Sequence, residues 1–268
     1  MIVGQAPAPI AMSLAHGAPI VKFGEVTRDA FLGGGLTIAQ PAKGFRSGLD
    51  SVLLGASVGV GRRTLLDLGA GAGTAALVAL ATHPDLTATL VEQAPEMLAL
   101  AETNVVDNGL TSRARVVAMD VTAPGRTRTA AGLAAESYDA VIANPPFYRD
   151  GTPAADQRST ARAMPAEALD LWVKAAASLA APQGEIVFLM PAHRLADLLE
   201  SFARFGAITI LPLVPRDGEP AYRVLLRGIK GSRAPLTLLA SRALHTPSGR
   251  TFRPEFEAIF RGRDRLHW

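Results

Sequence analysis

From residue 62 onward, short apolar runs alternate regularly with helix-like stretches. The first three runs are "TLLDL" (64–68), "TATLVE" (87–92) and "ARVVAMD" (114–120). Alanine- and leucine-rich helical segments, 74–82 and 95–109, separate them. Strands that alternate with helices form a parallel sheet covered by helices on both faces, with right-handed connections. The pattern therefore predicts an α/β, doubly wound fold.

The alternation continues to the end of the chain, with one change. Its further segments are the strands 138–144 and 184–191, the helices 165–180 and 193–206, and the strands 207–215 and 221–229. The last two strands are joined by too few residues for a helix, so they must run antiparallel. We expect a mostly parallel, seven-stranded sheet with one antiparallel strand near its end.

The sequence shows neither an internal repeat nor a linker between domains. Residues 1–25 are rich in alanine, proline and glycine without periodicity, which predicts a flexible N-terminal arm. Residues 26–268 are expected to form a single domain. No side chain before Lys22 is positively charged, and no stretch approaches the ~18 apolar residues of a membrane span. We therefore expect a cytoplasmic protein.

Composition limits the possible chemistry. The chain has 268 residues and no cysteine, which excludes disulfides and cysteine-bound zinc. The five histidines are scattered without ligand spacing, so we expect no metal. Of the 27 basic residues only four are lysines. Arginine binds phosphate in a bidentate way, which favours a nucleic-acid partner, but an arginine-rich genome explains the bias equally well.

A glycine-rich turn, "DLGAGAG" (67–73), follows the first strand and opens a helix. Glycines let the backbone turn tightly and approach a ligand closely. A dinucleotide fingerprint would read G-x-G-x-x-G, but Thr74 stands at the place of its last glycine. The turn thus departs from a dinucleotide site.

Two acids end the neighbouring strands: Glu92 the second and Asp120 the third. The carboxyl ends of parallel strands meet at one edge, where an acid can accept hydrogen bonds from ribose hydroxyls. Alone, each acid would suit a helix cap, and the glycines would suit tight packing. Together and in this order they predict a nucleoside site.

The fourth strand ends in "NPPFY" (144–148), a corner that two prolines make rigid. The Asn144 side-chain oxygen and the Pro145 carbonyl could each accept one hydrogen from an exocyclic amine of a base. That arrangement favours a pyramidal nitrogen whose lone pair can attack a sulfonium methyl group, through preorganisation rather than acid–base catalysis. Phe147 offers a face for base stacking. The alternative is a proline-rich turn with core aromatics.

These motifs, in the order "DLGAGAG", "VE", "MD" and "NPPFY", resemble class I S-adenosylmethionine-dependent methyltransferases that methylate planar amines. The upstream stretch 29–56, with its Gln, Gly-Phe-Arg and Asp before a leucine run, is similar to bacterial tRNA adenine-N6 methyltransferases, which modify an adenine beside the anticodon of a valine tRNA. The resemblance covers about residues 26–262. It implies a Rossmann-like fold, S-adenosylmethionine as cofactor and tRNA as partner.

The resemblance also implies roles for particular residues. Cofactor contacts would come from Phe45, Arg46, Asp50, Asp67, Gly69, Ala70, Gly71, Glu92, Gln93, Asp120, Val121 and Asn144. The catalytic pocket for the target base would consist of Asn144, Pro145, Pro146 and Phe147. The segment 26–60 would close over the cofactor site.

The RNA-facing candidates are Arg149, Arg158 and Arg162 in the loop 148–164, together with the arginine-rich end 242–268. Arg158 and Arg162 are four residues apart, so a helix would present both on one face. An exposed basic face without a partner is the alternative. The segment 122–137 reads as a loose, basic insert that could alter substrate choice.

Other functions use parts of the same pattern. Methyltransferases of a release-factor glutamine amide carry an N-terminal helical domain, whereas about 60 residues precede the glycine loop here. Guanine-N2 enzymes of ribosomal RNA often have a duplicated domain. A small-molecule O-methyltransferase would not need the two prolines, and a non-catalytic RNA-binding protein would not need Asn144.

Overall fold

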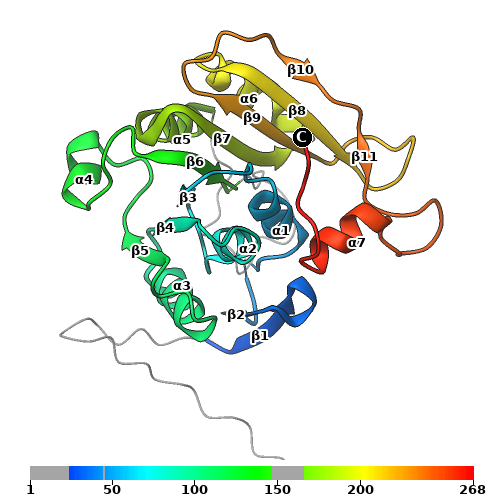
Figure 1. Ribbon diagram of the computed structural model, residues 1–268, viewed down its shortest axis with the longest axis horizontal. Helices are drawn as coiled ribbons and strands as arrows, with labels where there is room; N and C mark the ends of the chain where they lie inside the picture. The colour runs from blue at the N-terminus through cyan, green and yellow to red at the C-terminus, as the bar shows by residue number, and fades with distance from the viewer. Residues whose placement is uncertain (1–23, 45, 147–165) are drawn as a thin grey trace, which may run out of the picture.

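The computed structural model describes residues 24–44, 46–146 and 166–268. In these residues, nine strands form one large sheet that curves around α1 and α2 (Figure 1). In spatial order they are β10 (Thr237–Leu238), β8 (Gly206–Val214), β9 (Arg223–Ile229), β7 (Ala180–Pro191), β6 (Tyr138–Ala143), β3 (Thr64–Leu68), β4 (Thr87–Glu92) and β5 (Ala114–Ala118), with β11 (Arg242–Ala243) also on β8.

The strand directions confirm the expected topology. Within the sheet, β9 runs antiparallel to both β7 and β8, and the other pairs are parallel. The sheet has two strands more than expected, because the chain after β9 returns along the outer edge of β8 and pairs with it twice. Each of these pairings, β10 and β11, involves only two residues, too few to show an apolar alternation in the sequence.

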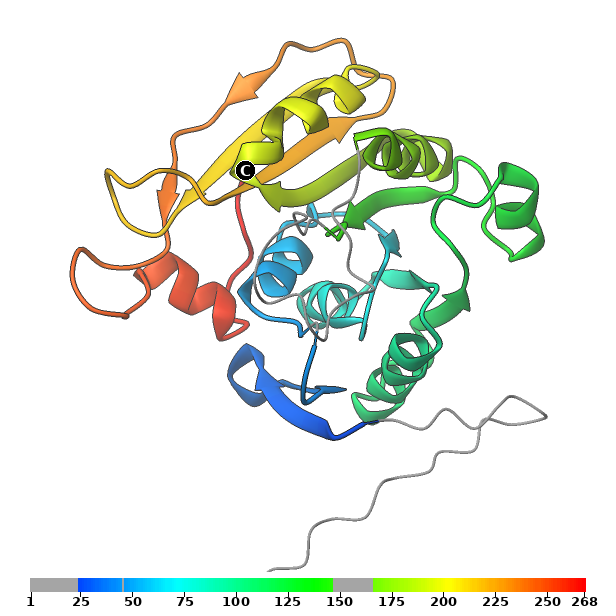
Figure 2. The ribbon, with the colours of Figure 1, turned by 180° about the vertical axis from the view of Figure 1, so that it is seen from behind.

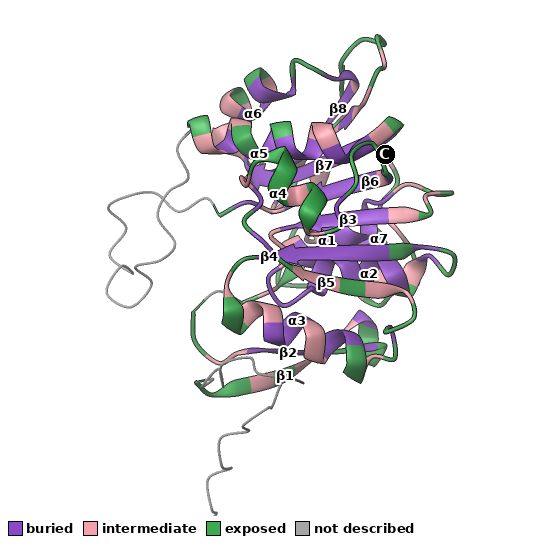
Figure 3. Cartoon of the chain, turned by 90° about the vertical axis from the view of Figure 1, so that its left-hand side faces the viewer, coloured by how far each residue is buried: buried purple, intermediate pink, exposed green. Residues whose placement is uncertain are grey.

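Helices cover both faces of the sheet (Figures 1 and 2). One face packs against α1 (Leu49–Ala56), α2 (Thr74–Thr82), α3 (Pro95–Asp107) and α7 (Pro254–Phe260), and the other against α5 (Ala166–Leu179) and α6 (Leu195–Phe202). Successive residues of a strand point to opposite faces. Leu65 accordingly lies in the first core and Leu66 in the second. Figure 3 shows the buried strands between these layers.

Two segments differ from the sequence expectation in detail. Before α1 the chain forms a separate hairpin, β1 (Val26–Phe31) and β2 (Leu36–Pro41), joined through η1 (Leu32–Gly34). From the sequence this segment was expected only to close over the cofactor site, and the hairpin was not predicted. The segment 122–137, expected to be a loose insert, contains the short helix α4 (Gly125–Ala130). The expected N-terminal arm lies almost entirely outside the described residues.

The described residues include no helix with the length and hydrophobicity that a membrane span requires. In the same ranges, no three histidine or acidic side chains are grouped as metal ligands.

Candidate functional site

Three central strands end at one level of the sheet. Leu68, the last residue of β3, pairs with Val91 of β4 on one side and with Ala143 of β6 on the other. Gly69 follows Leu68, Glu92 follows Val91 and Asn144 follows Ala143. These three residues therefore lie side by side at the carboxyl edge of the sheet. The structure thus brings together the glycine loop, the first acid and the proline corner that the sequence had separated by up to 75 residues.

The glycine loop depends on backbone conformations that other residues rarely adopt. Gly69, Gly71 and Gly73 have φ values of 68°, 57° and 85°. A Cβ atom on Gly69 would lie 2.4 Å from the Trp172 ring, and one on Gly73 would lie 2.7 Å from a methyl of Leu90. Tight packing, the alternative explanation that the sequence allowed for these glycines, therefore accounts for part of the pattern.

Glu92 holds the glycine loop against the end of β4. Its Oε2 accepts a hydrogen bond of 2.9 Å from the Gly71 N–H, and its Oε1 accepts bonds of 2.8 Å from the Gln93 and Ala94 N–H groups. The side chain is buried, with 9% of its surface exposed. A carboxylate has about four acceptor positions, so acceptor capacity remains for hydroxyl groups of a ligand.

Asp67 is buried beneath the same loop, with 2% of its surface exposed. Its Oδ2 accepts a hydrogen bond of 3.1 Å from the Ala76 N–H in the first turn of α2. Burial raises the pKa of Asp67 to about 7, the Ala76 bond opposes this rise and the charge of Glu92 adds to it. A site with two buried carboxyl groups and such a raised pKa favours a cationic ligand.

The Asn144 side chain has an unused acceptor. Its Oδ1 atom is buried, and it has no hydrogen-bond partner in the described part of the chain. Pro145 beside it is buried and Pro146 is exposed. A buried polar atom without a partner costs roughly 1–3 kcal/mol, so each one requires an explanation. The unpartnered oxygen is suited to a donor on a ligand.

Arg46 and Asp50, before and at the start of α1, already have partners within the protein. The Arg46 guanidinium donates to Asp29 (2.8 Å), Thr27 (2.8 Å) and the Pro41 carbonyl (2.7 Å), all of them in the hairpin. Asp50, in the first turn of α1, accepts a 2.8 Å hydrogen bond from Arg223 of β9. Their cofactor contacts stay predictions.

The other predicted cofactor residues follow β3, β4 and β5. Asp120 is exposed and closes a turn, because its Oδ1 accepts bonds of 2.8 Å from both the N–H and the hydroxyl of Thr122. Val121 is buried, Gln93 is exposed and Ala70 is half-buried. Their ligand contacts also stay predictions. The remaining predicted site residues, Phe45, Phe147, Arg149, Arg158 and Arg162, lie outside the described residues.

Two residues that contact predicted site residues were not identified from the sequence. Trp172 of α5 is buried, and its ring lies against Gly69. Arg223 holds Asp50 although 173 positions separate them. Neither contact has a local sequence signal, because each joins elements that only the sheet topology brings together.

Comparison with known proteins agrees with this geometry. The family model described as methyltransferase small domain matches residues 51–194. The chain is 30% identical over 186 residues to the tRNA1(Val) (adenine(37)-N6)-methyltransferase of Actinobacillus succinogenes, covering 68% of this chain and 76% of that protein. It is 30% identical over 195 residues to the enzyme of the same name from Serratia proteamaculans, covering 70% and 72%.

Solved structures share the fold. A predicted O-methyltransferase from Agrobacterium tumefaciens superposes with a TM-score of 0.69 and 30% identity, over 81% of this chain and 98% of that one. Pyrococcus horikoshii TYW2, solved with MeSAdo, has a TM-score of 0.53 over 77% of this chain and 72% of its own, and its 16% identity supports the fold alone. With the family model matching more than half of its length, the chain belongs to the methyltransferase small domain family and is an S-adenosylmethionine-dependent methyltransferase.

Proposed function

We propose that this methyltransferase modifies N6 of an adenine in tRNA. The observation that carries the proposal is the buried Oδ1 of Asn144 at the end of β6, which has no hydrogen-bond partner among the described residues and is followed by two prolines. The names of the relatives at 30% identity support the same substrate class. A tRNA substrate would also agree with the expected cytoplasmic location.

The site fits S-adenosylmethionine in charge. Asp67 and Glu92 place two carboxyl groups in a buried setting, and burial raises the pKa of Asp67 to about 7. A ligand with a sulfonium and an ammonium group would favour the ionised carboxyl groups. We assign Asp67, Gly69, Ala70 and Gly71 to the methionine part of the ligand. The ribose would contact Glu92 and Gln93, and the adenine would contact Asp120 and Val121.

The cofactor supplies an electrophilic methyl group, and the chain positions the amine that accepts it. Asn144 Oδ1 and the Pro145 carbonyl each accept one hydrogen of that amine, so that its lone pair is directed outward. The prolines fix both acceptors before the base arrives. The arrangement needs no side chain to remove a proton before the attack.

The role of Glu92 is testable by removing its charge. We expect Glu92→Gln to weaken S-adenosylmethionine binding about tenfold or more, because either orientation of the new amide places its NH₂ group against backbone N–H donors, those of Gly71 or of Gln93 and Ala94. Isothermal titration calorimetry measures the affinity directly.

Glu96→Gln is the matched control. Glu96 is an exposed acid in the first turn of α3, four residues from Glu92, and the change removes the same charge. It should leave the affinity within about twofold, since an exposed charge in water interacts weakly. Equal losses in the two variants would mean that Glu92 acts only through its charge and not through ribose hydrogen bonds.

The substrate is tested by transferring labelled methyl groups to unmodified total tRNA, followed by nucleoside digestion and mass spectrometry. N6-methyladenosine is the expected product. Label in N2-methylguanosine would replace adenine by guanine as the target. The description of the Agrobacterium neighbour makes a hydroxyl acceptor the second candidate. Label in no nucleoside would therefore direct the search to small-molecule hydroxyls and to protein amides.

A further inference from the structure

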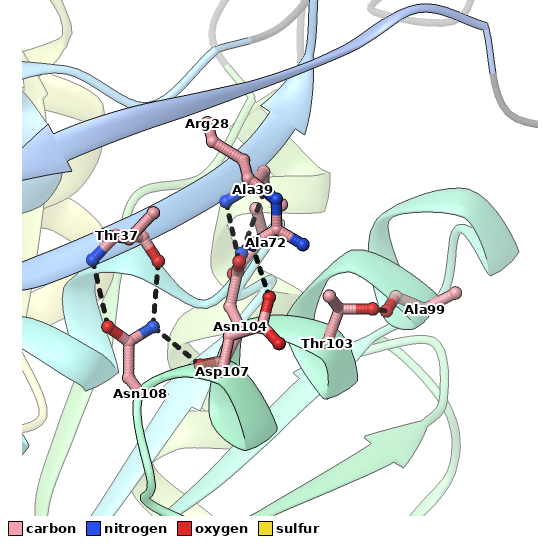
Figure 4. Close-up of polar contacts among 9 residues, drawn as sticks. All are labelled: Arg28, Thr37, Ala39, Ala72, Ala99, Thr103, Asn104, Asp107 and Asn108. Carbon is pink, nitrogen blue, oxygen red and sulfur yellow. Dashed lines mark hydrogen bonds and ion pairs between the residues drawn. The ribbon is translucent and has the colours of Figure 1, made fainter. Parts of the chain in front are cut away.

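Asn104 is a fully buried polar residue on α3, and all its bonds go to the backbone (Figure 4). Its Oδ1 accepts a hydrogen bond of 2.7 Å from the Ala39 N–H, and its Nδ2 donates at 2.9 Å to the Ala39 carbonyl. The Nδ2 also donates at 2.9 Å to the carbonyl of Ala72. Both donors and one acceptor position of the amide are therefore used.

Asn108, one turn later at the C-cap of α3, binds the same strand in the same way. Its Oδ1 accepts from the Thr37 N–H at 2.9 Å, and its Nδ2 donates to the Thr37 carbonyl at 2.8 Å. Four residues of a helix rise about 6 Å. Two residues of a strand rise about 6.6 Å and present their N–H and C=O groups on the same edge. The two asparagines thus match the free edge of β2, and α3 replaces a third strand of the hairpin.

The two asparagines differ in their third contact. Asn108 donates to the Asn104 carbonyl, within its own helix. Asn104 instead reaches Ala72 in the glycine loop. Ala72 follows Gly71, whose N–H bonds to Glu92, and precedes Gly73, the N-cap residue of α2. The Asn104 amide therefore connects the hairpin directly to the loop that contacts the carboxyl group of Glu92.

We propose that Asn104 is a positioning residue for S-adenosylmethionine, which fixes the glycine loop in its binding conformation and couples it to the β1–β2 hairpin. An amide suits this position, because it offers two donors to two carbonyls and one acceptor to an N–H. An aspartate would lack both donors. Without the Asn104 bond, the Ala72 carbonyl is buried and unpaired, and the loop is free to leave the conformation that presents the Gly71 N–H to Glu92.

The first test compares Asn104→Ala with Asn108→Ala by calorimetric titration with S-adenosylmethionine and S-adenosylhomocysteine. Both variants lose a pair of hydrogen bonds to the backbone of β2, but only Asn104→Ala loses the bond to Ala72. We expect Asn104→Ala to weaken both ligands about tenfold or more and Asn108→Ala less than about threefold. Thermal unfolding is measured alongside. A purely structural role would lower the Tm, but the ligand affinity of Asn104→Ala would then not differ from that of Asn108→Ala. Equal ligand affinities in the two variants would overturn the proposal.

A second test uses the unmodified protein, in case Asn104→Ala does not fold. Coupling between two sites is reciprocal, so ligand binding at the glycine loop should stabilise the hairpin. Saturating S-adenosylmethionine should slow hydrogen exchange of the Ala39 amide, which bonds to Asn104, about tenfold or more. The Thr37 amide, which bonds to Asn108, should slow less. An Ala39 amide that exchanges at the same rate with and without ligand would contradict the coupling. Neither test requires RNA, so a wrong substrate assignment would leave both results unaffected.

Discussion

Asn144→Ala is expected to lower the rate of methyl transfer about 100- to 1,000-fold and to change the affinity for S-adenosylmethionine by only a few-fold. The variant removes the buried Oδ1 atom, which has no hydrogen-bond partner among the described residues and is held by the rigid corner. A single preorganised hydrogen-bonding group at a reacting centre contributes about this factor. Because the acceptor acts mainly on the amine substrate, the loss should fall on the transfer step.

Single-turnover transfer to unmodified tRNA measures the rate, and calorimetry measures the cofactor affinity. Asn144→Asp is the control, since it keeps an oxygen acceptor of nearly the same shape at the same place. It should retain more activity than Asn144→Ala by about tenfold or more. If the alanine and aspartate variants were equally slow, the amide would act through its NH₂ group or through packing. An unchanged rate in Asn144→Ala would exclude the proposed role.

The sequence predicted the main sheet because its signals are local. The seven strands β3 to β9 are apolar runs, and the short connection before Arg223 required one antiparallel strand. The β1–β2 hairpin escaped prediction for the opposite reason. One face of its strand β1 is exposed and the other only half-buried, and the free edge of β2 is paired by side chains of α3. No neighbouring stretch of sequence contains that information.

The residues of the site also differ in how far the sequence could predict them. The glycine loop, Glu92 and Asn144 each stand at the carboxyl end of a predicted strand, so the topology alone placed them together. Trp172 contacts the glycine loop from α5, and Arg223 contacts Asp50 from β9, which lies between β7 and β8. Their positions depend on packing between layers. The buried Asp67 shows a further limit: its place was predictable, but the rise of its pKa depends on how completely the fold removes it from water.

Asp67 should make the protein less stable as the pH rises from about 4 to about 7. Burial raises its pKa from 3.8 to about 7 in the folded state, so in this range the folded protein keeps a proton that the unfolded chain has lost. Stability falls with pH where the folded state binds more protons, here by about 3–4 kcal/mol in total. Asp67→Asn removes this titration and should be more stable than the unmodified protein at pH 8. Urea unfolding from pH 4 to pH 8 measures the slope.

The same variant should bind S-adenosylmethionine more weakly, so stability and affinity change in opposite directions. A cationic ligand favours the ionised form of Asp67, and its binding near pH 7 should release a proton from this carboxyl group. Calorimetric titrations in two buffers of different ionisation enthalpy count the released protons, and Asp67→Asn should release fewer. Asp120→Asn, which removes an exposed carboxylate at the same edge of the sheet, should release as many protons as the unmodified protein. If proton release were the same in Asp67→Asn, the buried carboxyl group would not face the cationic part of the cofactor, and the carboxylate of Glu92 would then have to meet that charge alone.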